Sequence, residues 1–338
     1  MFQMSWINFF DGIKFINSPI TMSLVTAILV TGGEGVLGWH LAEKFLETGY
    51  KVFTTTKNGE RPKYTSRNYT LDIRDRSSFN NLPRDVDIVV HAAAISRVGI
   101  AQTNPDLCLK VNVDGTLNLA EWILSLERPP LLIFLSSREV YGEASYVPVD
   151  ENHPTNPISV YGKSKLMAEN ILHSRKTHGL RYTIIRLTNV YGSTRDYPNR
   201  VIPSFIINSL KRNPLIIYGG DQILDFLHLE DFLEAILKII DTSLNDEKKI
   251  SGLTFNLCSG IGYHLTDVAK LILMKTQSNS VIKVEKKRAY ETRTFIGNNS
   301  KARSLVGISF QIDFDKGITE YVEKMRNLVI NSLPGVQE

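Results

Sequence analysis

Residues 31–38 read Thr31-Gly32-Gly33-Glu34-Gly35-Val36-Leu37-Gly38, and this stretch decides the fold. A short apolar run at 26–31 precedes it and predicts a strand buried on both faces of a parallel sheet. After it, apolar residues within 35–48 recur on one helical face, and Gly49 supplies the stop. The stretch is therefore a strand-to-helix turn.

Each of three positions in this turn requires glycine for a different physical reason. Gly32 permits a tight turn, Gly35 lets the backbone approach a ligand, and Gly38 lets the helix lie close to the strand. A helix N-terminus offers unpaired N–H groups and a partial positive charge to phosphates. The turn therefore predicts a dinucleotide site whose cofactor-binding residues are Gly32, Gly35, Val36, Leu37 and Gly38.

The end of the next strand, expected over 52–56, bears on the choice of dinucleotide. An acid there usually binds the ribose 2′-hydroxyl of NAD. The sequence instead has Thr54-Thr55-Thr56-Lys57, with no carboxylate. Thr56 and Lys57 suit a 2′-phosphate, so we expect NADP(H) to be favoured over NAD(H); the alternative is that Lys57 is a solvated charge.

Strand and helix patterns alternate through the first part of the chain. Further strands are expected at 69–73, 87–91, 131–136 and 182–187, and helices at 104–126 and 158–178. This alternation predicts an α/β protein with a Rossmann-type doubly wound parallel sheet.

Beyond residue 192 the alternation loosens, which predicts a small C-terminal α/β substrate-binding lobe over 193–330. Helices are expected at 202–211, 230–240, 266–275 and 315–327, with a strand at 255–257. The dinucleotide-binding domain would span 22–192, with returning segments near 225–262. Residues 1–21 form an apolar extension before Met22: either an addition from an upstream start or an amphipathic helix that docks on a partner or a membrane surface.

Composition excludes several classes of protein. The 338 residues are 43% hydrophobic and 22% charged, with a net charge of +4 and no basic run, which argues against nucleic-acid binding. No export signal or long apolar span is present, so we expect a cytoplasmic protein without an integral membrane segment. Cys108 and Cys258 lie in no metal-binding spacing, which predicts two reduced, packed cysteines and no metal.

Tyr161 and Lys165 are four residues apart, so on a helix they share one face. An unperturbed tyrosine has a pKa of about 10, and a neighbouring lysine cation lowers it. Ser137, at the end of an expected strand, would hydrogen-bond the same substrate oxygen. The three residues form a candidate proton-transfer group beside a hydride acceptor.

At this point the chain resembles the extended short-chain dehydrogenase/reductase family, which contains nucleotide-sugar epimerases and dehydratases. The resemblance covers about 26–330, and its matching stretches are TGGEGVLG (31–38), LDI (71–73), HAAA (91–94), NVDGT (112–116), SSREVYG (136–142), YGKSK (161–165), RLTNVYG (186–192), DFLHLED (225–231), FNLCSG (255–260) and NNSKA (298–302).

The resemblance implies roles for further residues. Asp72 and Ile73 would flank the adenine, and Ala92 and Ala93 would line the cofactor cleft, where Tyr161 and Lys165 would also meet the cofactor. Residues that would bind the substrate are Ser96, Arg138, Asn189 and Arg288, of which the last two would meet the diphosphate. For Asn112, the alternative to a functional role is a structural one, in which it only braces the packing of the helices.

Two positions depart from the family pattern. Leu224 stands where members often carry an arginine that contacts the nucleotide. Arg138-Glu139 stands where dehydratases tend to carry Asp-Glu, so 4,6-dehydration loses its expected general acid. Glu139 is a candidate catalytic base next to a 4-keto group, or a structural hydrogen-bond partner.

The leading interpretation is an epimerase/dehydratase-type redox enzyme that acts on a nucleotide-activated sugar. Its alternatives are an NADPH-dependent 4-keto-sugar reductase and a non-catalytic dinucleotide-binding sensor or scaffold. Family members commonly form homodimers through the two long helices. An apolar face for that contact would come from Leu107, Val111, Leu119 and Trp122, or these residues pack on the protein's own sheet.

Overall fold

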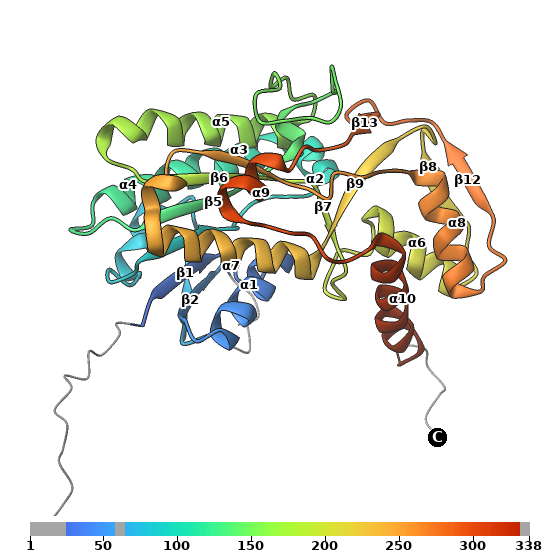
Figure 1. Ribbon diagram of the computed structural model, residues 1–338, viewed down its shortest axis with the longest axis horizontal. Helices are drawn as coiled ribbons and strands as arrows, with labels where there is room; N and C mark the ends of the chain where they lie inside the picture. Colours follow the sequence, from blue (N-terminus) through green and yellow to red (C-terminus); the bar gives the residue numbers. More distant parts are fainter. Residues whose placement is uncertain (1–24, 58–64, 332–338) are drawn as a thin grey trace, which may run out of the picture.

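The structure, a computed structural model, describes residues 25–57 and 65–331. Seven parallel strands form its main sheet in the order β10-β6-β5-β4-β1-β2-β3 (Figure 1). The strands are β1 (Ala27–Thr31), β2 (Lys51–Thr56), β3 (Arg67–Thr70), β4 (Ile88–His91), β5 (Leu131–Ser137), β6 (Tyr182–Leu187) and β10 (Thr254–Leu257). The predicted Rossmann-type doubly wound sheet is confirmed.

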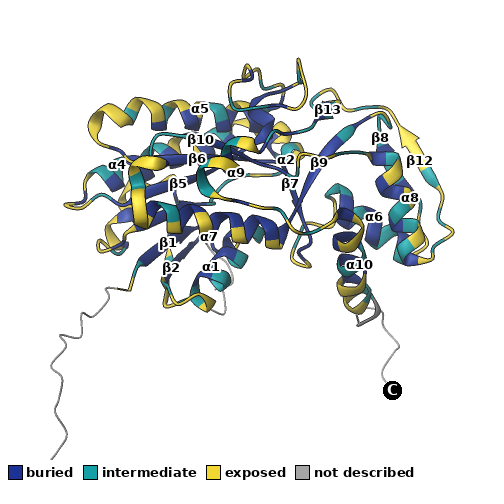
Figure 2. Cartoon of the chain, viewed as in Figure 1, coloured by how far each residue is buried: buried dark blue, intermediate teal, exposed yellow. Residues whose placement is uncertain are grey.

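Helices cover both faces of this sheet, which explains why the central strands β1, β4 and β5 are rich in apolar residues. One face carries α1 (Val36–Glu47), α7 (Leu229–Asp246) and α9 (Ser300–Val306). The other carries α4 (Gly115–Leu124) and α5 (Val160–Arg175). Figure 2 shows the central strands of the sheet buried, whereas the edge strand β3 is not, and these helices are buried on one side only.

The helix expected over 104–126 is interrupted. The chain forms α3 (Pro105–Leu109), a π-helical turn (Lys110–Asp114) and then α4. Asn112 lies in that turn, and its amide bonds the backbone N–H and carbonyl of Ile95 and the Ser164 hydroxyl. These bonds support the alternative in which Asn112 braces the helix packing.

A smaller lobe occupies the end of the molecule opposite α4 (Figure 1). Its helices α6 (Val201–Leu210), α8 (Leu265–Thr276) and α10 (Phe314–Asn331) share an apolar core. A two-stranded sheet, β12-β8, lies at its edge, and a second small sheet joins the lobe to the main sheet. The strands are β7 (Asn189–Tyr191), β8 (Leu215–Tyr218), β9 (Ile223–His228), β11 (Gly262–His264), β12 (Ile282–Glu285) and β13 (Thr294–Phe295).

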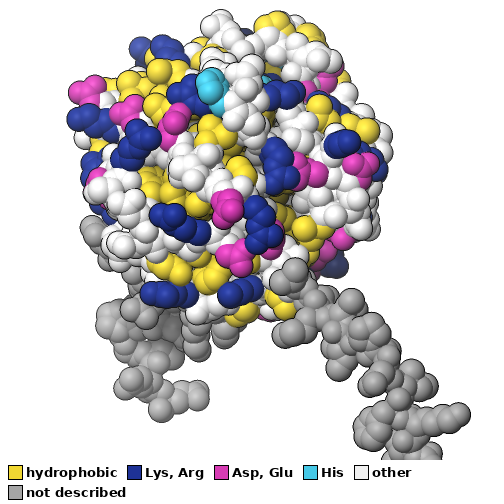
Figure 3. Space-filling view, turned by 90° about the vertical axis from the view of Figure 1, so that its left-hand side faces the viewer, with side chains coloured by type: hydrophobic (Ala, Val, Ile, Leu, Met, Phe, Trp, Pro, Cys, Tyr) yellow, Lys and Arg dark blue, Asp and Glu magenta, His cyan; other side chains and the backbone are white. Residues whose placement is uncertain are grey.

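Residues 1–21, for which an extension or an amphipathic helix is expected, lie outside the described residues. Within the described part, no helix is long and apolar enough to cross a membrane. Cys108 and Cys258 are both buried and unpaired. On the face of the molecule that Figure 3 shows, basic and acidic side chains are interspersed with apolar ones.

Candidate active site

The candidate site lies where the order of the main sheet reverses. The chain leaves β1 for β2 on one side, and β4 pairs with β1 on the other side. At such a switch point, the loops that follow the two strands separate and leave a crevice for a ligand. The glycine turn follows β1, and Ala92 and Ala93 follow β4, so both loops flank this point.

The glycine turn forms a cradle that side chains would fill. Gly32 has φ +71°, and a Cβ there would lie 2.7 Å from the backbone of Ala93. A Cβ on Gly38 would lie 2.2 Å from the Gly32 carbonyl oxygen. Gly35 is the N-cap of α1 and has no side chain with which to cap it. These residues fit a dinucleotide, because the N–H groups of Val36 and Leu37 remain open to a diphosphate.

Two hydroxyl groups near the end of β2 form hydrogen bonds with the neighbouring strand β3. Thr56 is 4% exposed, and its hydroxyl accepts a hydrogen bond from the Asn68 amide at 3.0 Å. The Thr54 hydroxyl donates to the carbonyl oxygen of the same amide at 2.8 Å. Asn68 of the neighbouring strand β3 therefore contacts Thr56, one of the two residues that we expected to bind a 2′-phosphate.

Lys57 lies in a group of charged side chains of both signs. Its ammonium lies 3.8 Å from the Asp72 carboxylate. Asp72 also accepts from the Arg74 guanidinium, which lowers the pKa of that carboxyl to about 2. The backbone N–H of Lys57 donates to Glu34 Oε1 at 3.1 Å. Two carboxylates thus balance the two cations at this end of the sheet.

Ser137 and Tyr161 meet at the carboxyl edge of the sheet. Ser137 is the last residue of β5, and Tyr161 lies in the first turn of α5. Both residues are 8% exposed, and Ser137 is near enough to Tyr161 to lower the pKa of the phenol by hydrogen bonding. Lys165 lies one turn further along α5, and its ammonium donates to the Leu135 carbonyl at 2.8 Å. The structure therefore brings the three predicted residues together.

Burial controls the protonation of this group in the ligand-free protein. It raises the pKa of Tyr161 well above its usual range, and the hydrogen bond from Ser137 opposes that shift. Burial also lowers the pKa of Lys165 to about 8. The expected lowering of the tyrosine pKa is therefore absent without ligand, because loss of hydration outweighs the effects that favour the phenolate.

Arg138 and Glu139 form a buried ion pair directly after Ser137. The guanidinium lies 3.0 Å from Glu139 Oε1, and each side chain is 10% exposed. Arg138 also donates to the Thr292 hydroxyl at 2.8 Å, and the Ser159 hydroxyl donates to Glu139 Oε2 at 3.2 Å. Both residues lie at the predicted site, but each is occupied by a protein partner.

The other sequence-predicted residues are distributed around the same edge. Ser96 is exposed in the loop after β4. Asn189 begins β7, and its amide donates to the Asp225 carbonyl at 3.0 Å. Arg288 stacks on the ring of Tyr218 with its guanidinium carbon 3.7 Å from the centroid, and it pairs with Glu291. Ile73 is buried, and it packs so closely on Gly115 of α4 that a Cβ there would lie 2.7 Å away.

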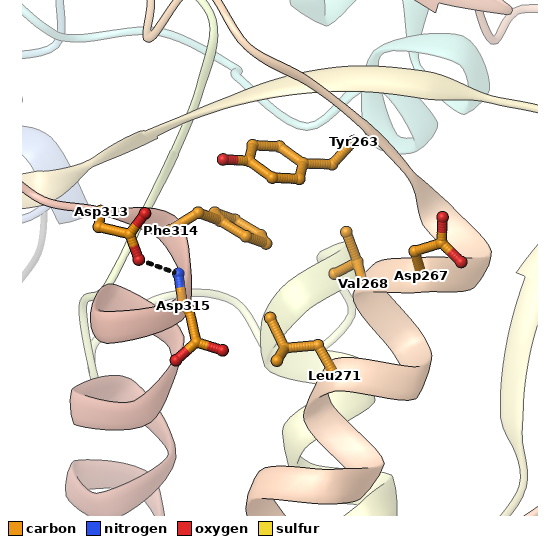
Figure 4. A pocket seen from close by; sticks show the side chains of 7 residues that line it. All are labelled: Tyr263, Asp267, Val268, Leu271, Asp313, Phe314 and Asp315. Atoms are coloured by element: carbon orange, nitrogen blue, oxygen red, sulfur yellow. Dashed lines mark hydrogen bonds between the residues drawn. The ribbon is translucent and has the colours of Figure 1, made fainter.

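A separate cavity of about 220 Å³ lies in the smaller lobe between α8 and α10 (Figure 4). Tyr263 and Phe314 stack beside it, and three aspartates line it. Asp313 accepts the N–H of Asp315 at the start of α10. Asp267 and Asp315 pair with lysines. No predicted site residue lines this cavity, and its acids have structural partners.

Comparisons with known proteins agree with this geometry. The sequence profile of the NAD dependent epimerase/dehydratase family matches residues 28–258. A Methanocaldococcus jannaschii protein, provisionally assigned as a UDP-glucose 4-epimerase, is 34% identical over 311 residues, which cover 89% of this chain and 98% of the relative. The crystal structure of a Thermotoga maritima UDP-glucose 4-epimerase with UDP-glucose is 28% identical at a TM-score of 0.82, and covers 90% of this chain and 100% of that one.

The expectation that NADP(H) is favoured is wrong. MoeE5, solved with UDP-glucose and NAD, is 25% identical (TM-score 0.80; 90% of this chain, 99% of that one). A Bacillus cereus UDP-glucuronic acid 4-epimerase, solved with UDP-glucuronic acid and NAD, is also 25% identical (TM-score 0.82; 90% and 100%). The physical reason lies in Thr56 and Lys57. The Asp72 carboxylate beside Lys57 offsets the positive charge that would attract a 2′-phosphate, and the Asn68 amide already donates to the Thr56 hydroxyl.

Proposed function

The chain belongs to the NAD dependent epimerase/dehydratase family, and on that premise we propose that it is an NAD-using UDP-hexose 4-epimerase. The observation that carries the proposal is the placement of Ser137 at the end of β5 and of Tyr161 in the first turn of α5, with Lys165 one turn further along this helix. UDP-glucose 4-epimerases among the similar proteins support the choice of sugar nucleotide.

The chain's own residues would move a proton at the sugar hydroxyl. Tyr161 would take that proton while Ser137 holds the same oxygen by a hydrogen bond. Lys165 is cationic below its pKa of about 8, and its charge favours the phenolate form of Tyr161. NAD, when bound, would reversibly accept hydride from the adjacent sugar carbon. After the keto-sugar has turned over, return of the hydride to the other face of the same carbon and of the proton from Tyr161 to the oxygen would complete an epimerisation.

The contacts of Glu139 favour an epimerase over a dehydratase as the proposed function. A dehydratase needs a carboxylate free to remove a proton next to the keto group. The carboxylate of Glu139 is paired with Arg138 and accepts from the Ser159 hydroxyl. We therefore assign Glu139 a positioning role. The alternative function, a keto-sugar reductase, rested on the expected preference for NADP. The residues at the end of β2 do not provide that preference.

We propose that the substrate lies between the two lobes, where Asn189, Arg288, Ser96 and Arg138 contact it. We also propose a cytoplasmic homodimer. Leu119 is buried in the protein's own core, and Val111 and Trp122 pack against that core. Leu107 on α3 and Met167 on α5 are 39% and 46% exposed, so they supply the apolar surface for a partner subunit.

The test is interconversion of UDP-galactose and UDP-glucose by the purified protein with NAD, followed by NMR. Tyr161→Phe should lower the rate by about 10²- to 10⁴-fold, because it removes the proton-transfer group. Its affinity for NAD, measured by calorimetry, should not change. Tyr50→Phe, which alters a tyrosine that precedes β2 at the opposite edge of the sheet, is the matched control.

Other outcomes would overturn the proposal in distinguishable ways. Stoichiometric consumption of reduced cofactor with a keto-sugar would indicate a reductase. A wild-type protein that binds NAD but converts no UDP-sugar would indicate a sensor or scaffold. Equal rates for Tyr161→Phe and Tyr50→Phe would remove Tyr161 from the chemistry.

A further inference from the structure

Glu34 projects a carboxylate from the glycine turn to the end of β2. It lies between Gly33 and Gly35, and its Oε1 accepts the backbone N–H of Lys57 at 3.1 Å. The turn and the strand are joined a second time, because the Gly33 N–H donates to the Thr55 carbonyl at 2.8 Å. The carboxylate is therefore held over the last residues of β2 although it belongs to another loop.

This is the position at which a dinucleotide-binding sheet ordinarily needs an acid. The adenosine ribose lies beyond the end of the second strand, and a carboxylate there accepts hydrogen bonds from its hydroxyls. Strand β2 provides no acid, and the Thr56 hydroxyl is bonded to Asn68. Glu34 is exposed, so its second oxygen can meet a ligand while the first holds Lys57.

The surrounding charges reinforce the choice of a hydroxyl over a phosphate. Lys57 lies 3.8 Å from Asp72, and Arg74 binds the same carboxylate. Because Asp72 neutralises one of these cations, and Glu34 adds a second negative charge, a 2′-phosphate would meet no excess of positive charge.

We propose that Glu34 is the acid that binds the adenosine ribose hydroxyls and excludes a 2′-phosphate, which makes the chain selective for NAD. The acid thus comes from the glycine turn rather than from the second strand. This inference rests on the dinucleotide site of the proposed function, and it concerns cofactor binding alone.

Titration calorimetry with NAD and with NADP, after removal of any copurified nucleotide, tests the proposal. Glu34→Gln keeps an amide oxygen for the Lys57 N–H but removes the negative charge. It should weaken NAD binding and strengthen NADP binding, so that the NAD:NADP affinity ratio falls about tenfold, equivalent to about 1.4 kcal/mol. Glu47→Gln, an exposed acid at the far end of α1, should keep the wild-type ratio.

Glu34→Ala separates charge from turn geometry, because it loses both the charge and the bond to Lys57. If Glu34→Gln keeps the wild-type ratio and only Glu34→Ala changes binding, the carboxylate merely closes the turn and the proposal is overturned. A wild-type protein that binds both dinucleotides equally also overturns it. Loss of NAD selectivity in Glu34→Gln supports the proposal even if no UDP-sugar is converted, so its failure is distinguishable from that of the epimerase function.

Discussion

Arg138 and Glu139 show at the residue scale why a sequence pattern does not settle a role. The pair occupies a site where related dehydratases carry catalytic groups, which made Glu139 a candidate base. In the structure its carboxylate has two protein partners, Arg138 and Ser159. The sequence made Glu139 a candidate, but its bond to Ser159 depends on a segment that only folding brings to it.

Glu139→Gln should destabilise the protein by about 3 kcal/mol, because it leaves the buried Arg138 without its counter-ion. Denaturant unfolding measures this change. The double variant Arg138→Met/Glu139→Gln should recover most of the loss, because no unpaired charge then remains. A double variant as unstable as the single one would contradict the ion-pair account.

Helix α5 carries Tyr161 and Lys165, and its start controls their position. Ser159 is its N-cap: the hydroxyl accepts the Gly162 N–H at 3.0 Å and donates to Glu139. The sequence predicted the helix from residue 158, after two prolines, close to its observed start at Val160. The prolines that precede the helix are a local signal, so its start could be predicted from the sequence.

Ser159→Ala should cost about 1 kcal/mol of stability through loss of the cap. It should also lower kcat for epimerisation more than it changes KM, because the first turn of α5 positions Tyr161. Thermal unfolding and steady-state kinetics measure the two effects. Ser174→Ala, an exposed serine near the end of the same helix, is the control. Equal kinetics for both variants would limit Ser159 to stability.

The interruption of the helix expected over 104–126 was not predictable in the same way. Nothing in the apolar period indicates the π-helical turn at Lys110–Asp114. The turn carries Asn112, whose amide reaches Ile95 and Ser164. Its location is thus tied to contacts between segments remote in sequence.

At the scale of the whole molecule, some histidine side chains lose their contact with water when the chain folds. Burial lowers the pKa of His91 to about 3, and it lowers the pKa of His228. His91 bonds Thr31 on β1 and Thr116 on α4, so it joins the sheet to its helical layer at the switch point. These rings are neutral in the folded protein and gain protons more readily when it unfolds.

Stability should therefore fall on acidification. Between about pH 6.5 and 3 the unfolded chain binds more protons than the folded one at His91, so the free energy of unfolding decreases as pH falls through this window. Unfolding of wild type and His91→Gln at pH 7 and pH 5 measures the effect. The variant should lose less stability than wild type over this interval.

His178→Gln serves as the control for this pH dependence, because its exposed ring is hydrated in both states. It should keep the wild-type slope. If His91→Gln also keeps that slope, His91 does not contribute to acid sensitivity.

The sequence by itself determined the parallel sheet, the glycine turn and the meeting of Ser137 with Tyr161. These follow from local rules: the steric freedom of glycine, the period of apolar residues, and the convergence of parallel strand ends on one edge. The small lobe was expected, but strands β8, β9 and β12 were not, because they are short and each needs a partner remote in sequence.

Only the tertiary structure decided the chemistry at the end of β2 and the protonation of Tyr161. Thr56 and Lys57 appeared to be phosphate ligands because the sequence does not show that Asn68 and Asp72 engage them. Glu34 is 23 residues from Lys57, yet their contact places an acid where the strand has none. Hydrogen bonds, ion pairs and burial depend on which surfaces meet, and that information exists only once the chain has folded.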